Sequence, residues 1–521
     1  MDATAAANLK QDLQEGRITT DRLCEVLASQ QRTIHTLTQR VEAAQQRAEA
    51  AEQRCAELEQ KQGGPPTTKL DEAYSMRAEE KRQAAAGKKR KPKRNKRRGR
   101  RCTKDKIAAA ERTEAVYPDG IPHDQCWLSH VRPVWRLEHN RAVLIAYEIY
   151  RGPNNRYGQI PGVLGRSEFG MEIVAELAHL VYILGLSFDK ACAQLHFFQN
   201  LKLSKAQANV LLYKLARHWE HQFDVLCTLL ANSLVVHADE TGWSLNSVWA
   251  LLSEKARVLL FGVHKDAETL KRILDPASFA GLLISDDAAV YEQFSATQKC
   301  WAHLIRKGIK LVLQAPDRAD YRTFTDGLLE IYREACRIQR DQRFSMAGRA
   351  AKVAQLDERI LALTGACSIE ELLAAEGLEH EFGLLVAEVM RLMLSQSLFP
   401  FVTTPPVQQP NKVSKPVSGT NNEAERTLRS AAQARDTGRT NKTGNGARRQ
   451  TILTSVLESL RLYLPTYTLG SVMEELRRWW IDGCSCFEKL LNKSKLKLKA
   501  TATSTIDRIF PSSSPEPSPT G

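Results

Sequence analysis

Residues 235–243, VVHADETGW, place the acid pair Asp239-Glu240 directly after a run of β-branched residues. Because β-branched residues favour strands, the sequence predicts a strand that ends at Asp239. Strands commonly end at Asp or Glu, so two interpretations are open. Asp239 is either an ordinary strand end or a carboxylate held at a strand tip to bind a metal ion. The choice depends on where the other carboxylates of the chain lie.

The segments that follow alternate between strand and helix patterns. We predict strands at 232–239, 248–254, 256–264 and 281–287, helices at 266–274 and 288–294, and a short strand leading into a helix at 299–313. Three strands, a helix and a fourth strand are the order of a ribonuclease-H-like sheet, in which the first and fourth strands are neighbours. Asp286 ends the fourth strand and would therefore meet Asp239.

A third carboxylate comes from the C-terminal half of the chain. Residues 315–398 have a helical pattern, and a Pro/Gln/Ser stretch at 405–419 interrupts it. The segment TNNEAERTLRSA then restarts a helix, with Asn421 or Asn422 as its cap and Glu425 in its first turns. Three carboxylates repel one another unless cations lie between them. Mg²⁺ or Mn²⁺ suits such oxygen ligands, and two ions promote phosphoryl transfer.

The N-terminal part has a different character. Apolar residues between Leu23 and Leu58 recur at heptad spacing, which predicts a coiled coil and self-association; a lone amphipathic helix docked on the body is the alternative. Residues 87–101, GKKRKPKRNKRRGRR, contain 11 Lys or Arg and hold most of the net charge of +14. Such a tract is predicted to be a flexible arm that binds DNA phosphates, with a solubilising linker as the alternative. The basic residues are Lys88, Lys89, Arg90, Lys91, Lys93, Arg94, Lys96, Arg97, Arg98, Arg100 and Arg101.

Two small motifs precede the sheet. The segments VRPVWRLE and RAVLIAYEIYRG alternate apolar and polar residues around His139-Asn140, which predicts a hairpin. His123, Cys126, His130 and His139 lie nearby, but without a Cys-x-x-Cys knuckle we expect no structural zinc. Further on, two helical segments have the N-cap candidates Ser187 and Ser204. They form either a helix-turn-helix that reads DNA or a simple packing unit.

The 11 cysteines are scattered, and the sequence has neither a signal peptide nor a long apolar span. These features predict a reducing, cytoplasmic compartment and no membrane association.

Four blocks, HADETG, SDDAAVY, CWAHLIRK and TNNEAERTLR…GRTN, occur in the order seen in transposases of the insertion-sequence-66 family, and the chain resembles that family over about residues 170–465. The resemblance implies that Asp239, Asp286 and Glu425 are an Asp-Asp-Glu catalytic and metal-binding triad. The family's acid lies five positions before the Tyr, here Tyr291, which selects Asp286 over Asp287. Further DNA contacts are expected from Arg426, Arg439, Asn441 and Lys442, and His303 and Arg306 either contact DNA phosphate or orient the triad. For His303, a satisfied, buried histidine is the alternative.

The chain departs from the family pattern at two places. The segment before the helices lacks the paired Cys-x-x-Cys motifs, and the block after Glu425 reads GRTNKTGNGARR, which points to specialised end recognition.

The resemblance implies a bacterial transposase that cleaves DNA at element ends and joins them to target DNA. It also implies terminal inverted repeats and target DNA as partners, a homodimer or higher oligomer, accessory proteins of the same element and a place at the nucleoid. Two other interpretations are a DNA-binding regulator, or domesticated descendant, and a stand-alone nuclease.

The predicted fold is a multidomain α+β protein with a ribonuclease-H-like α/β catalytic core. The expected parts are a coiled coil at 1–62, a basic linker at 63–115, a β-rich, degenerate zinc-finger-like segment at 116–165, a helical region at 166–231, the first part of the core at 232–314, a large helical insertion at 315–417, the second part of the core at 418–480, and a basic, disordered tail at 481–521.

Overall fold

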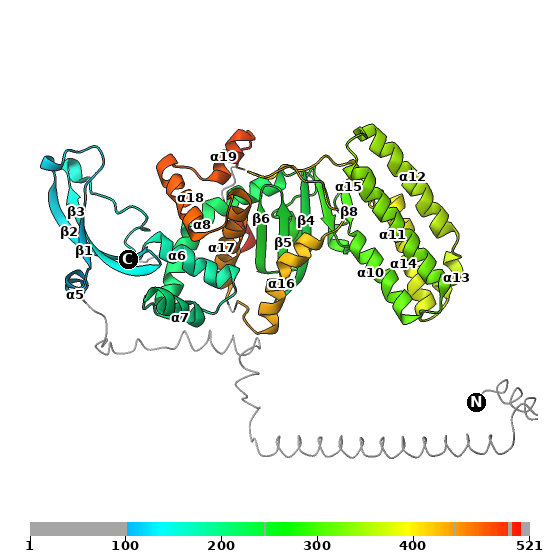
Figure 1. Ribbon diagram of the computed structural model, residues 1–521, viewed down its shortest axis with the longest axis horizontal. Coiled ribbons are helices and arrows are strands. Elements are labelled where there is room, and N and C mark those ends of the chain that lie inside the picture. The colour runs from blue at the N-terminus through cyan, green and yellow to red at the C-terminus, as the bar shows by residue number, and fades with distance from the viewer. Residues whose placement is uncertain (1–101, 244–245, 442, 499–502, 512–521) are drawn as a thin grey trace, which may run out of the picture. The chain divides into compact units, whose positions relative to one another are not determined.

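A computed structural model describes residues 102–243, 246–441, 443–498 and 503–511 (Figure 1). The chain divides into two units, Met1–Arg100 and Arg101–Gly521, and the described residues belong to the second. The predicted coiled coil and the basic tract lie outside the described residues. None of the described helices is both long and apolar enough to cross a membrane.

The described part begins with a helix and a three-stranded sheet. Helix α5 spans Thr103–Ala108. The strands β1 (Arg112–Val116), β2 (Trp127–Glu138) and β3 (Arg141–Arg151) have the order β1-β3-β2. Strands β2 and β3 form the predicted antiparallel hairpin. The linker predicted at 63–115 therefore ends before residue 112, because β1 pairs in parallel with β3 and so belongs to this sheet.

A group of helices follows: α6 (Met171–Ala178), a π-helical turn (His179–Ile183), α7 (Phe188–Gln199) and α8 (Lys205–Ala231). Both predicted N-caps are confirmed. The Ser187 hydroxyl accepts the N–H of Lys190, and the Ser204 hydroxyl accepts the N–H of Gln207. These hydroxyls satisfy backbone donors that have no partner within the helix.

The central sheet has five strands in the order β6-β5-β4-β7-β8. Its members are β4 (Val235–Trp243), β5 (Asn246–Ser253), β6 (Arg257–Val263), β7 (Leu282–Ser285) and β8 (Thr297–Lys299). Strands β4, β5 and β6 are antiparallel, whereas β7 pairs in parallel with β4, as predicted for the first and fourth strands. The prediction that the first strand ends at Asp239 was wrong, because β4 stays paired with β5 as far as Trp243.

Helices α9 (Ala267–Lys271) and α10 (Trp301–Gln314) lie where the sequence predicted them. The helix predicted at 288–294 is only a 3₁₀ turn, Ala289–Tyr291. Tyr291 and Phe294 are both buried in the hydrophobic core, so the short crossover consists of one tight turn and a loop, 292–296, before β8.

Helices cover both faces of the central sheet (Figure 1). Helix α16 (Asn422–Asp436) packs on one face, and α8 and α17 (Gly444–Tyr463) share a core with the other. Helix α17 also closes the edge at β6. Three of its hydroxyls, spaced four residues apart, accept N–H groups from alternate residues of β6: Ser459 from Arg257, Ser455 from Leu259 and Thr451 from Phe261. An edge strand that would otherwise be open is thus satisfied.

The opposite edge, β8, carries the helical segment between α10 and α16. Its helices are α11 (Ala319–Arg340), α12 (Met346–Gly365), α13 (Ile369–Ala374), α14 (Leu378–Leu394) and α15 (Pro400–Thr403), and they enclose a hydrophobic core of their own. The Lys299 N–H donates to the carbonyl of Ser397 at 2.8 Å, and the Gln298 amide donates to that of Leu398 at 2.9 Å. The helical segment is thus joined to the sheet by hydrogen bonds.

Three helices close the described chain: α18 (Leu469–Asp482), α19 (Cys486–Lys493) and α20 (Thr505–Ile509). The tail predicted at 481–521 is therefore wrong over 486–493 and 505–509. Apolar side chains spaced at helical intervals, Phe487 with Leu491 and Ile506 with Ile509, are buried in the main core. This burial stabilises helices that are too short to persist alone.

Candidate active site

Asp239 and Asp286 lie at matching positions on neighbouring strands. The last paired residues of β4 and β7 are His237 and Ile284, and each acid comes two positions later. Asp239 is held in place on its other side, where it pairs with Ala250 of β5. Parallel register therefore brings the two acids together at the end of β7, as the sequence predicted.

Glu425 comes from α16, which packs over the same face as Asp239. Ala250, the cross-strand partner of Asp239, shares a core with Ala424 and Leu428 of this helix. Asn421 fixes where the helix begins. It occupies the predicted N-cap position, but its fully buried side chain makes no capping bond and instead donates to the carbonyl of Ala238 at 2.7 Å. The start of α16 is thus tied to the residue that precedes Asp239.

Burial, reinforced by the negative charges of Glu240, Asp286 and Glu425, raises the pKa of Asp239 to about 7. This carboxyl is therefore partly protonated at neutral pH, because it is buried and lies near other negative charges. This crowding of oxygen donors is relieved by a divalent cation. The donor set accordingly fits a hard ion such as Mg²⁺ or Mn²⁺.

Glu240 points to the opposite side of β4, as strand alternation predicted. Only 2% of its side chain is exposed, so its role there is structural. Its carboxylate pairs with Lys265 at 2.7 Å and accepts a hydrogen bond from the Tyr291 hydroxyl. Tyr291, the landmark used to choose Asp286, thus anchors Glu240 from the crossover after β7.

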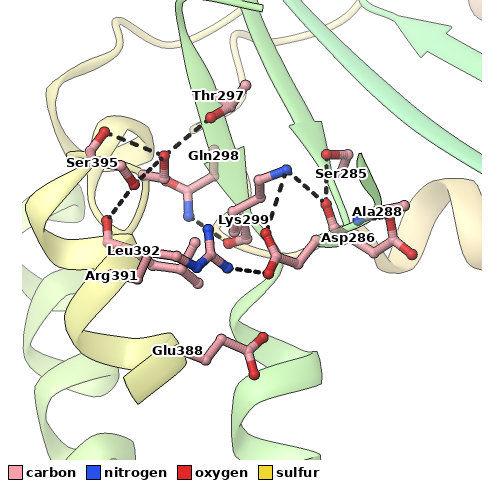
Figure 2. Close-up of polar contacts among 12 residues, drawn as sticks. Ser285, Asp286, Ala288, Thr297, Gln298, Lys299, Glu388, Arg391, Leu392 and Ser395 are labelled. Carbon is pink, nitrogen blue, oxygen red and sulfur yellow. Dashed lines mark hydrogen bonds and ion pairs between the residues drawn. The ribbon is translucent and has the colours of Figure 1, made fainter. Parts of the chain in front are cut away.

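The acids Asp286 and Asp287 have different surroundings, and Figure 2 shows Arg391 of α14 and Lys299 of β8 converging on this loop. Asp287 is paired with Arg391, and its carboxylate lies 3.8 Å from the ammonium of Lys299. Lys299 also donates to the backbone carbonyl of Asp286 at 3.0 Å. With respect to the described residues, the Asp286 carboxylate forms no ion pair and accepts the N–H of Ala288 at 3.2 Å. Asp286 is thus the acid left available for a cation.

His303 and Arg306 both face Glu425 from the first turns of α10. A guanidinium nitrogen of Arg306 donates to Oε1 of Glu425 at 2.9 Å, and Nε2 of His303 lies 3.7 Å from the same oxygen. The alternative of a satisfied, buried histidine is wrong, because 39% of the His303 side chain is exposed. These two residues of α10 therefore hold Glu425 in place.

Cys300 lies directly before α10 and is buried beneath this group. Its sulfur accepts the N–H of Asn421 at 3.1 Å. Burial raises the pKa of the thiol, although backbone N–H groups around the sulfur act in the opposite direction. The thiol is thus protonated at neutral pH, which makes Cys300 a poor nucleophile.

The remaining predicted DNA contacts that the structure describes bond to partners other than Glu425. Arg426 is exposed and donates to the carbonyl of Asn422 in its own helix. Arg439 donates to the carbonyl of Gly185 at 2.7 Å, and Asn441 donates to Gln450 at 2.8 Å. Lys442, like the basic tract, lies outside the described residues. Arg439 and Asn441 line a pocket of about 350 Å³ between the π-helical turn, α16 and α17.

The histidines and the cysteine near the hairpin are engaged separately, and each of His123, Cys126 and His130 contacts a different residue. His123 stacks on Tyr117, Cys126 donates to the carbonyl of Pro122, and His130 contacts Ser129. His139 lies in the hairpin turn itself, with φ at 47°.

Four side chains with clear roles in this arrangement were not predicted: Lys265, Lys299, Arg391 and the Asn421 amide. Lys265 follows β6 and Lys299 is the last residue of β8, so the order of the strands offered a signal for both. No sequence signal indicated Arg391, because its pairing with Asp287 depends on the packing of α14, more than 100 residues further along the chain.

The family comparison agrees with this arrangement. The family model for IS66 transposases matches residues 166–449, which include β4, β7 and α16. A comparison with curated protein sequences finds no match. DNA is the partner that this family implies, and divalent metal ions are its general requirement. With more than half of its length matched, the chain belongs to the IS66 family of transposases.

Proposed function

We propose that this transposase cleaves DNA at the ends of an insertion sequence and joins the freed 3′-hydroxyl to target DNA. Asp239, Asp286 and Glu425 are its catalytic carboxylates, and they hold two Mg²⁺ or Mn²⁺ ions. The observation that carries the proposal is the matched register of Asp239 and Asp286 on β4 and β7. The strand order agrees with a ribonuclease-H-like core, in which α11–α15 form a helical insertion.

When bound, the ions would activate a water or 3′-hydroxyl and stabilise the leaving oxygen of the phosphodiester. The protein's own task is to bring three carboxylates together against their mutual repulsion. Strand pairing holds Asp239 and Asp286, and the Asn421 amide holds the start of the Glu425 helix. Arg306 neutralises Glu425 until cations arrive, and the exposed sides of Arg306 and His303 are free to meet DNA phosphate.

DNA contacts are proposed in two further places. The basic tract at 87–101 would bind phosphates without regard to sequence, because its lysines and arginines release condensed counterions. The helix pair α7–α8 and the exposed Arg426 would contact the element end. Self-association through residues 1–62 would hold two ends in one complex.

The test uses full-length protein with DNA that carries the inverted repeats flanking the gene, a supercoiled target plasmid and Mg²⁺. A covalent joint between an element 3′ end and the plasmid is the expected product. End-specific binding without any nicking would instead establish a regulator. Nicking that ignores the ends and yields no joint would establish a nuclease.

A further inference from the structure

We propose that Cys300, His303 and Glu425 form a second kind of metal site, one that binds a borderline-soft divalent ion such as Zn²⁺ or Co²⁺. The site shares Glu425 with the proposed magnesium centre but differs from it in ligand chemistry. The proposal that the ion binds depends only on these three residues. Its consequence for DNA joining rests on the proposed function.

Geometry is the first argument. One ligand atom from each of the three residues lies within 4.8 Å of the other two, and no other group of this kind occurs within the described ranges. His303 Nε2 lies 3.7 Å from Glu425 Oε1. Zinc–ligand bonds are about 2.0–2.3 Å long, so small side-chain rotations bring all three atoms onto one ion.

The backbone explains why these ligands meet. Cys300 is the N-cap of α10, and His303 lies three positions later on the same side of its first turn. The N–H of Asn421 donates to the Cys300 sulfur, and Asn421 begins the helix that carries Glu425. The same contact therefore places the carboxylate beside the sulfur and supplies the N–H that a metal-bound thiolate accepts.

His303 supplies a second observation that points to a ligand. Its Nδ1 is buried and has no hydrogen-bond partner among the described residues, while Nε2 faces the carboxylate without donating to it at hydrogen-bond distance. A buried ring nitrogen without a hydrogen-bond partner carries a desolvation cost. A metal ion bound at Nδ1 would supply the missing partner.

The ligand set favours Zn²⁺ or Co²⁺ over Mg²⁺. Thiolate and imidazole suit borderline-soft ions, whereas Mg²⁺ takes oxygen ligands and keeps its waters. On binding, the Cys300 thiol loses its proton to solvent and the sulfur bonds the ion. Three protein ligands then leave the fourth position of a tetrahedral site to water. Arg306 turns away from Glu425 into solvent, where 55% of its side chain already lies.

An ion at this site withdraws Glu425 from Asp239 and Asp286. Zinc would therefore inhibit DNA joining even when Mg²⁺ is plentiful, because Zn²⁺ binds nitrogen and sulfur ligands far more tightly.

Titration of the full-length protein with Co²⁺ tests the binding directly. A thiolate-to-cobalt charge-transfer band at one equivalent is the expected result, and it should be lost in Cys300→Ser and strongly weakened in His303→Ala and Glu425→Gln. Cys336→Ser, Cys126→Ser and Asp239→Asn are matched controls that should keep the band. A band that survives Cys300→Ser, or no band in the parent, overturns the proposal; thermal melting of each variant confirms that it is folded.

DNA joining supplies the second readout. Zinc should lower joining by the parent at least tenfold, whereas joining by Cys300→Ser, compared with its own zinc-free rate, should change less than twofold. Equal inhibition of both proteins contradicts the shared-ligand mechanism. If the cobalt band is present but the parent never joins DNA, the metal site stands and the proposed function fails.

Discussion

The side-chain amide of Asn421 donates a 2.7 Å hydrogen bond to the carbonyl of Ala238, the residue immediately before Asp239. This bond ties the strand that carries Asp239 to the start of the helix that carries Glu425 in its first turn. The two acids lie 186 positions apart in the sequence.

Replacing Asn421 with alanine should loosen the Glu425 helix and leave the Ala238 carbonyl without its buried donor. We expect a loss of about 1–3 kcal/mol in the free energy of unfolding. We also expect a several-fold rise in the Mg²⁺ concentration that gives half-maximal joining. Asn422→Ala is the matched control, because Asn422 is exposed one position later. Equal effects of the two substitutions would refute this role of Asn421.

Removing the charge of Asp239 should stabilise the metal-free protein at alkaline pH. The pKa of Asp239 is about 7 in the folded state, against an ordinary value of 3.8, so the folded state binds the extra proton and its stability declines as pH rises between these values. Asp239→Asn removes that decline. With a chelator present, its melting temperature should exceed that of the parent by a few degrees at pH 8 and by less at pH 5.5.

The expected difference between these two pH values corresponds to about 2 kcal/mol, since one pKa unit is about 1.4 kcal/mol. Mg²⁺ should raise the melting temperature of the parent more than that of the variant. A difference in melting temperature that does not vary with pH would contradict the crowding of charges around Asp239.

The neighbouring acids Asp286 and Asp287 should respond in opposite ways to loss of charge. Asp286→Asn should abolish joining and leave the melting temperature nearly unchanged. Asp287→Asn breaks the ion pairs with Arg391 and Lys299, so it should lower the melting temperature and retain measurable joining. Arg391→Ala should reproduce the stability loss, and Arg391→Lys should restore part of it. Abolished joining in Asp287→Asn with normal activity in Asp286→Asn would reverse the assignment.

Deleting residues 87–101 should weaken DNA binding and flatten its dependence on salt. Each phosphate contact that is lost lowers the slope of log K against log[salt] by about 0.9 for duplex DNA. Filter binding or fluorescence anisotropy between low and moderate salt measures this slope. An unchanged slope would show that the tract does not contact DNA.

The sequence predicted those parts of the site that depend on strand order. Asp239 and Asp286 each follow a β-branched or apolar run, and their neighbourhood follows from the pairing of two strands. Glu425 required a helix start that Asn421-Asn422 signals, although the Asn421 side chain bonds β4 rather than its own helix.

What the sequence could not predict depends on packing between distant segments. The burial of Glu240 depends on Lys265 and Tyr291, and the use of Arg439 on the carbonyl of Gly185, 254 positions away. Helices α19 and α20 were missed because they are short and their polar surroundings resemble a tail. These helices are stabilised by apolar residues that pack into a core shared with α8 and α17.

The most direct test of the central claim is joining of a pre-cleaved element end to a target plasmid in Mg²⁺ by three isosteric variants, Asp239→Asn, Asp286→Asn and Glu425→Gln. Glu240→Gln serves as the matched control, because Glu240 lies next to Asp239 but on the other side of β4. The account predicts that each triad variant binds the end like the parent and yields no joined product, while Glu240→Gln still joins. Joining at the parent's rate by any one of the three would contradict it.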